Sequence, residues 1–151
     1  MPDRKTLERA AEDKAEGKSP STQAGEFVRE EMEHVREGKH GARSAKQAIA
    51  IGLSKARRAG VALEPPAKGE ASDKTRQDAR RAIAAAARKP KTVSARRSRA
   101  ASGALKREGS SAASPLALAR QAKAASRKRG QKARSAAARK AARTRSRRTK
   151  S

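Results

Sequence analysis

The chain has 151 residues and a formal net charge of +25, from 40 Lys and Arg against 15 Asp and Glu, and it contains no Cys. The missing Cys excludes a disulfide framework, a thiolate zinc site and a thiol nucleophile. Leu, Ile, Val and Phe together number 14, about 9% of the chain, which is too few for a sizeable hydrophobic core.

Charge divides the chain into a nearly neutral part and a strongly basic part. Residues 1–70 carry a net charge of +2, and residues 71–151 carry +23. This asymmetry indicates a small head followed by a basic interaction tail. No apolar run approaches the ~18 residues of a membrane span, and the N-terminus has no apolar signal segment. We therefore expect a cytoplasmic protein that does not bind membranes.

Residues 1–21 are polar, with Leu7 as the only large apolar residue after Met1. We expect a flexible N-terminus there.

Residues 22–63 hold most of the large apolar side chains and are predicted to form a helical hairpin. Thr22 is a candidate cap for a first helix, and Gly38 suits the left-handed position that ends it. The apolar stripe of this helix repeats with helical spacing and consists of Phe27, Val28, Met32 and Val35.

The second helix of the hairpin is predicted to begin after Ser44, with Gln47 completing a capping box. Gly60 ends this helix. The first helix is rich in Glu and the second in Lys and Arg. Opposite charges therefore favour the pairing of the two helices.

The remaining sequence is predicted to be a linker at 64–74 and a mostly disordered, helix-prone tail at 75–151. Ala-rich segments begin near Thr75, Ser94 and Pro115, and none has enough large apolar residues to pack firmly. The predicted fold class is all-α: a short helical hairpin with a largely disordered basic tail rich in Ala, Arg and Lys.

Metal and catalytic motifs are poorly supported by the sequence. Glu31 and His34 have the spacing of one half of a di-iron motif, which needs a second copy, so a solvated helix face is the interpretation. His34 and His40 do not share one element at a metal-binding spacing, and the carboxylates Glu30 and Glu33 lack a cleft. We expect no enzyme activity, no cofactor and no metal site.

The tail favours nucleic acid as a partner, because no acidic residue occurs from Gly109 to Ser151. Exposed cations neutralise phosphates and release condensed counterions, and such contacts carry no sequence information. Phe27 is the only aromatic residue, which argues against base stacking. The predicted nucleic-acid-binding residues are Lys55, Arg57, Arg58, Arg96, Arg97, Arg99, Lys106, Arg107, Arg120, Lys123, Arg127, Lys128, Arg129, Lys132, Arg134, Arg139, Lys140, Arg143, Arg145, Arg147 and Arg148.

Residues 38–41 (GKHG) and 46–61 (KQAIAIGLSKARRAGV) resemble a block shared by a family of small bacterial proteins, some of which are labelled plasmid stabilisation proteins. The resemblance implies a role in plasmid maintenance and transfers no catalytic residue. The tail is similar to the basic tails of linker histones and bacterial histone-like proteins, which implies nucleic-acid compaction.

The sequence thus predicts a non-specific nucleic-acid-binding protein of the bacterial nucleoid, with duplex DNA favoured over RNA. Two alternatives stay open. The chain is an RNA- or ribosome-associated basic protein, or the hairpin at 22–63 binds a protein partner while the tail only localises it.

Overall fold

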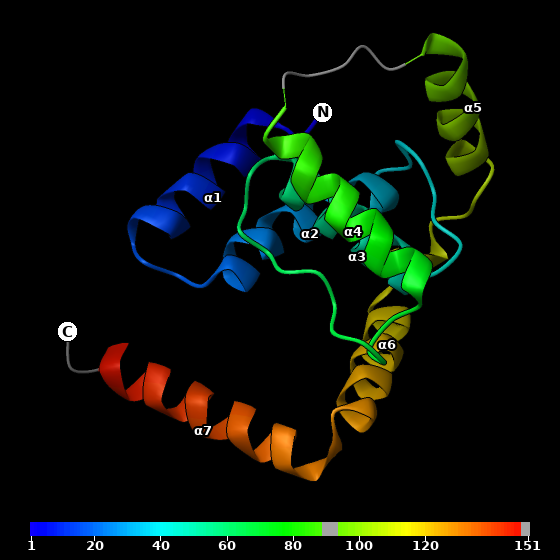
Figure 1. Cartoon of the computed structure of the whole chain (residues 1–151). Coiled ribbons are helices and arrows are strands. Elements are labelled where there is room, and N and C mark those ends of the chain that lie inside the picture. Colours follow the sequence, from blue (N-terminus) through cyan, green and yellow to red (C-terminus); the bar gives the residue numbers. More distant parts are fainter. Residues whose placement is uncertain (89–93, 149–151) are drawn as a thin grey trace. The chain divides into compact units, whose positions relative to one another are not determined.

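The computed structural model describes residues 1–88 and 94–148. The described residues contain helices and no strand, so the protein is all-α as predicted. The chain divides into two units, which we call the head (Met1–Ser114) and the arm (Pro115–Ser151). The elements of the head are α1 (Arg4–Ala15), α2 (Pro20–Arg36), α3 (Ala45–Arg58), α4 (Asp73–Ala86), α5 (Ala95–Lys106) and the short 3₁₀ helix η1 (Ser111–Ala113) (Figure 1). The arm consists of α6 (Pro115–Lys128) and α7 (Gly130–Arg148).

Helices α2 and α3 form the hairpin at the centre of the head. Ser44 caps α3, because its Oγ accepts the Gln47 N–H at 3.2 Å. Gly38 has a φ of +70° just after α2, which explains the glycine at this position. The predicted cap of α2 was wrong: Ser19 caps the helix and Pro20 occupies its first turn, so α2 begins before Thr22.

The core of the head is built mainly from small side chains. Phe27 and Val35 are buried on α2. Leu53, Val61 and Leu63 are partly buried and pack against the cluster that contains Phe27. Alanines of several helices fill the remaining interior, namely Ala10, Ala24, Ala48, Ala56, Ala79 and Ala82. Because Ala buries little apolar area, the core is small for the length of chain in the head.

The expected flexible N-terminus is a helix in the structure. Helix α1 packs on α2 and buries Thr6 and Ala10. The backbone N–H of Asp3 donates to Oε2 of Glu30 at 3.1 Å. Polar and small residues therefore fasten this helix, which is why a search for large apolar side chains missed it.

Residues 105–113, which were expected to belong to the basic tail, pack against the head, and we call them the returning segment. The backbone N–H groups of Gly41 and Ala42 donate to the carbonyls of Leu105 and Gly109, at 2.9 and 3.1 Å. Nε of Arg36 donates to the Ala113 carbonyl at 3.1 Å, and Ala113 itself is fully buried. The head therefore extends to residue 114 and includes a cover over the α2–α3 turn.

The structure has regular helices where a largely disordered tail was expected. Helices α5, α6 and α7 cover most of the described tail, and none of the described residues of α5 and α6 is buried. Ala and Arg are among the strongest helix formers. Local propensity therefore accounts for these helices without a hydrophobic core.

We expect Gly52→Ala to destabilise the head by about 1–3 kcal/mol, the usual cost of overpacking. A Cβ at Gly52 would lie 2.7 Å from Cα of Val28, where α3 crosses α2. The measurement is the free energy of unfolding in urea, followed by circular dichroism.

The matched control is Gly25→Ala in α2, where a Cβ meets nothing within 4 Å. This exposed helical position should gain about 0.5–1 kcal/mol from the higher helix propensity of Ala. Equal effects of the two substitutions would contradict the close crossing at Gly52.

Candidate functional site

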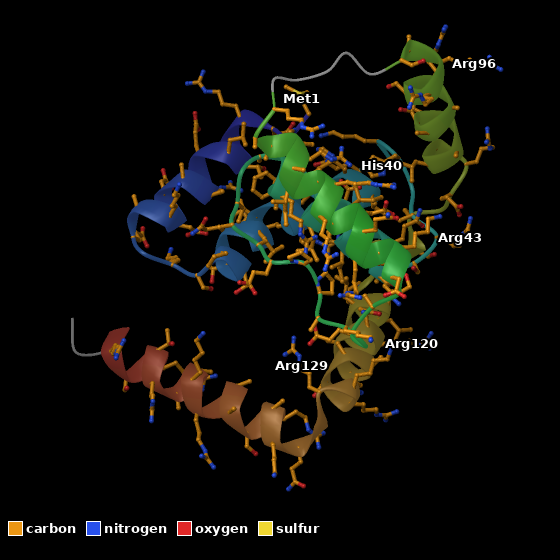
Figure 2. The ribbon with its side chains drawn as sticks, viewed as in Figure 1. Met1, His40, Arg43, Arg96, Arg120 and Arg129 are labelled. Carbon is orange, nitrogen blue, oxygen red and sulfur yellow. The ribbon has the colours of Figure 1, made fainter. Side chains whose placement is uncertain are left out.

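The predicted nucleic-acid-binding residues of the tail lie on the surface of both units. Figure 2 shows Arg96, Arg120 and Arg129 pointing away from the ribbon. All predicted tail residues whose side chains are described are exposed, and only Arg148 falls outside that set. These cations are therefore accessible to a polyanion.

The arm presents its cations along its helices. On α6, Arg120, Lys123 and Arg127 are spaced three and four residues apart, which places them on one face. On α7, Lys132, Arg139 and Arg143 share a face by the same rule. With 19 residues, α7 is about 28 Å long, a length that corresponds to several phosphate spacings of a nucleic-acid strand.

Two of the three predicted cations of the hairpin are engaged inside the head, which corrects their assignment. Lys55 Nζ lies 2.7 Å from Oε2 of Glu31. Arg57 is buried and donates to the carbonyls of Leu63 and Glu64, at 3.2 and 3.0 Å. Only Arg58 is exposed. Both corrected residues lie on the side of α3 that faces other parts of the head, which the count of charges could not reveal.

A buried polar cluster lies between α2 and α3. Glu30 and Glu31 are 4% and 0% exposed, and the ammonium of Lys55 serves both, at 3.1 Å from Oε1 of Glu30. The interpretation of Glu31 as part of a solvated helix face was wrong, because α3 and the turn before it cover this side of α2.

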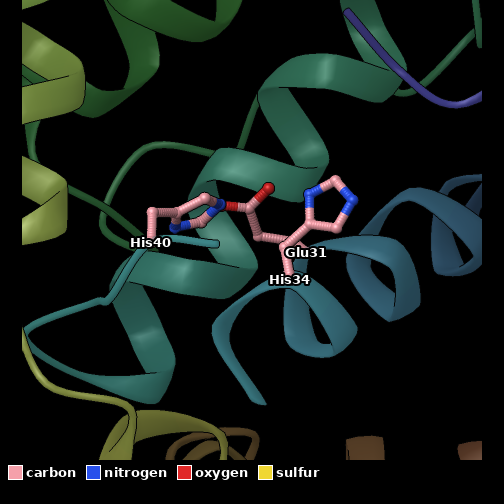
Figure 3. Close-up of side chains that lie close together, drawn as sticks. All are labelled: Glu31, His34 and His40. Atoms are coloured by element: carbon pink, nitrogen blue, oxygen red, sulfur yellow. The ribbon is translucent and has the colours of Figure 1, made fainter. Parts of the chain in front are cut away.

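Two histidines border the same cluster (Figure 3). Nε2 of His40 lies 3.3 Å from Oε1 of Glu31, and Nε2 of His34 lies 3.4 Å from Oδ2 of Asp3. The two rings meet edge to face, with centroids 5.9 Å apart. Glu31, His34 and His40 thus form a compact group of potential ligands, and so do Asp3, Glu30 and His34.

Sequence reasoning missed this cluster because His40 lies in the turn between the helices. Glu31 and His34 gave a signal through their spacing on one helix face. The turn that contains His40 folds back over α2, which brings the second imidazole to the same carboxylate. A pairing that depends on the path of a turn leaves no periodic trace in the sequence.

We expect the head to lose stability as the pH falls into the acid range. Burial is the largest influence on Glu30 and would raise its pKa, but hydrogen bonds from Thr6, the Asp3 N–H and Lys55 hold the pKa below its usual value of 4.5. A carboxyl with a lowered pKa stabilises the fold above 4.5, and this contribution is lost as the pH falls through the folded-state value.

At alkaline pH, the stability of the head should fall as the pH rises. Burial opposes the charge of Lys55, but Glu31 and Glu30 together raise the pKa of Lys55 above 10.5. Its contribution is present below pH 10.5 and is lost as the pH rises through the folded-state value. Melting temperatures measured across the pH range check both predictions. Glu30→Gln should reduce the fall in melting temperature at acid pH. An unchanged fall at acid pH in this variant would contradict the assignment to Glu30.

No family model, curated protein or solved structure matches this chain. Among the described helices, none is long and apolar enough to cross a membrane.

Proposed function

We propose that the protein binds duplex DNA without sequence preference, mainly through the cations of the arm and of α5. The observation that carries this proposal is the contrast in charge pairing between the two units. In the head, acidic side chains pair with Lys55, Arg9, Arg29 and Lys18. Neither the arm nor α5 contains an Asp or Glu, so neither segment supplies an acidic side chain that could pair with its own cations.

The chemistry of these cations favours phosphate contacts over base readout. Arginine predominates in the arm, and its guanidinium forms forked hydrogen bonds with phosphate oxygens. Phosphate contacts position a protein on a duplex and do not discriminate sequence. The arm has no aromatic residue on which an unpaired base could stack. These features together support binding to a double-stranded backbone.

The proposed setting is the bacterial nucleoid or plasmid maintenance. It rests on the resemblance of residues 38–61 to small proteins labelled as plasmid stabilisation proteins, and on the histone-like composition of the tail. A strongly basic helical unit that follows a folded head along the chain suits a protein that coats DNA or holds it in place.

The test is fluorescence anisotropy of the full chain with duplex DNA, structured RNA and heparin over a series of KCl concentrations. With about ten cations engaged, the logarithm of the affinity for duplex DNA should fall with log[salt] at a slope of about −9. An affinity that is insensitive to salt would overturn the proposal. Tighter binding of RNA than of duplex DNA at every salt concentration would replace DNA with RNA as the partner.

A further inference from the structure

The polar cluster of the head carries more negative charge than its own ammonium balances. Glu30 and Glu31 are buried and share the single ammonium of Lys55. Both oxygens of Glu31 are enclosed. Oε2 has the Lys55 ammonium at 2.7 Å, whereas Oε1 has no hydrogen-bond partner among the described residues. A buried carboxylate oxygen without a partner is costly unless a cation compensates it. The cluster therefore calls for a second positive charge near Oε1 of Glu31.

His40 faces two groups that can only accept hydrogen bonds when Glu31 is ionised. Nδ1 of His40 lies 3.1 Å from the carbonyl oxygen of Gly41, and Nε2 lies 3.3 Å from Oε1 of Glu31. A neutral imidazole has one N–H and therefore cannot donate to both groups. In the tautomer whose Nδ1–H donates to the Gly41 carbonyl, Nε2 directs its lone pair at a carboxylate oxygen, which is repulsive unless a cation lies between them. This orientation by a backbone carbonyl is typical of histidines that bind metals.

His34 completes the group from the same helix face as Glu31. Its Nε2 lies 3.4 Å from Oδ2 of Asp3, so an N–H at this position donates to Asp3 and leaves Nδ1 as the ligand atom. One ligand atom from each of Glu31, His34 and His40 lies within 4.8 Å of the others (Figure 3).

We propose that Glu31, His34 and His40 bind a divalent transition-metal ion of the zinc type, through Oε1 of Glu31 and one ring nitrogen of each histidine. Two imidazoles and one carboxylate form a ligand set that suits Zn²⁺ or Co²⁺ and leaves a fourth position for water. Bonds of about 2.0–2.1 Å require the three ligand atoms to draw closer than they stand here. Rotation of the two imidazoles, which are partly exposed at the edge of the cluster, supplies this movement.

A metal ion at this site would stabilise the fold of the head, a role that is independent of the proposed DNA binding. The turn that contains His40 also donates its next two N–H groups, those of Gly41 and Ala42, to the returning segment at Leu105 and Gly109. A metal ion on His40 would therefore join α2, the turn and the returning segment. Binding to the folded state alone should raise the melting temperature.

The experiment titrates Co²⁺ and Zn²⁺ into the full chain after treatment with EDTA. Because the chain has two His and no Cys, imidazole ligation seen in the visible Co²⁺ spectrum comes from these two side chains alone. We expect one equivalent of metal to bind and the melting temperature to rise. His34→Ala and His40→Ala should each weaken binding by at least about 100-fold, the upper end of what a change outside the ligand set costs. Glu37→Gln, which alters an exposed carboxylate next to the end of α2, is the matched control and should bind like the unaltered chain.

Two results would overturn the proposal: no Co²⁺ spectrum at saturating metal, or the same affinity in both histidine variants. Circular dichroism without metal checks that each variant folds. If a variant unfolds, the histidine ring protons of the unaltered chain give the answer by NMR. Co²⁺ must give the ring protons of both His34 and His40 the large contact shifts of a directly bound imidazole, and contact shifts for neither or for only one refute the site. If protonated His40 alone supplied the second positive charge next to Glu31, Co²⁺ would shift the signals of neither histidine in this way.

Discussion

Removing the arm by truncation after Ser114 should abolish most of the affinity for duplex DNA and most of its salt dependence. The arm holds 14 of the 40 Lys and Arg residues and no acidic residue. Each phosphate contact contributes about −0.9 to the slope of log affinity against log[salt]. Loss of ten contacts therefore removes a slope of about −9, which corresponds to about 10⁵-fold in affinity between 50 and 200 mM salt. Anisotropy titrations of the full and truncated chains at several KCl concentrations measure both quantities.

A full-length variant separates charge from chain length. Changing Lys132, Arg139 and Arg143 to Gln keeps α7 intact and should reduce the slope by about 2.7. The matched control removes three exposed cations of the head and should leave the slope almost unchanged; it changes Lys5, Lys14 and Lys46 to Gln. Equal effects of the two triple variants would show that net charge, and not the arm, drives binding. Circular dichroism of the truncated chain is the control that tests whether the head still folds.

Lys55→Met should be the most destabilising single substitution in the head, with a cost of about 3–5 kcal/mol. The side chain of Lys55 is 20% exposed, while those of Glu30 and Glu31 are 3% and 0% exposed. Removing the ammonium leaves two buried carboxylates without their shared partner, and their mutual repulsion adds to the desolvation cost. This loss is a large fraction of the 5–15 kcal/mol that stabilises an ordinary domain. Urea unfolding of the full chain measures it.

Lys46→Met on the same helix is the control, because Lys46 is exposed. Its effect should stay within about 0.5 kcal/mol. Replacing Glu30 and Glu31 by Gln together with Lys55→Met should recover part of the lost stability, since no unbalanced charge remains. If Lys55→Met costs no more than Lys46→Met, the carboxylates are not held by this ammonium.

Local signals in the sequence predicted the helical class and several helix ends. Ser44, Gly38 and Pro115 act on the backbone within a few residues of themselves, so their roles can be deduced without the fold. The helical arm follows in the same way from the propensities of Ala and Arg. The expectation of disorder failed because it took the lack of large apolar residues to mean that the helix-prone segments of the tail would not form stable helices.

Features that depend on packing were out of reach. The core uses Ala in place of Leu, and alanine burial depends on how closely the helices approach, as at Gly52. The inward orientation of Lys55 and Arg57 depends on which side of α3 meets α2 and the chain that follows α3. The meeting of His40 with Glu31 depends on the turn between two helices. None of these leaves a pattern that charge counts or periodicity can detect.

The hydrogen bonds of residues 105–113 to the head give the cations of α5 and those of the arm different fates after proteolysis. Along the chain, α5 follows α4, which packs on α3, and precedes the carbonyls of Leu105 and Gly109, which accept hydrogen bonds from the N–H groups of Gly41 and Ala42 in the α2–α3 turn. After a single backbone cut within α5, the piece before the cut would stay linked to α4, and the piece after it would stay hydrogen-bonded to the turn. The chain passes from the head to the arm after Ser114. One cleavage there would set α6 and α7 free as a diffusing polycation, while Arg96, Arg97 and Arg99 would stay with the head.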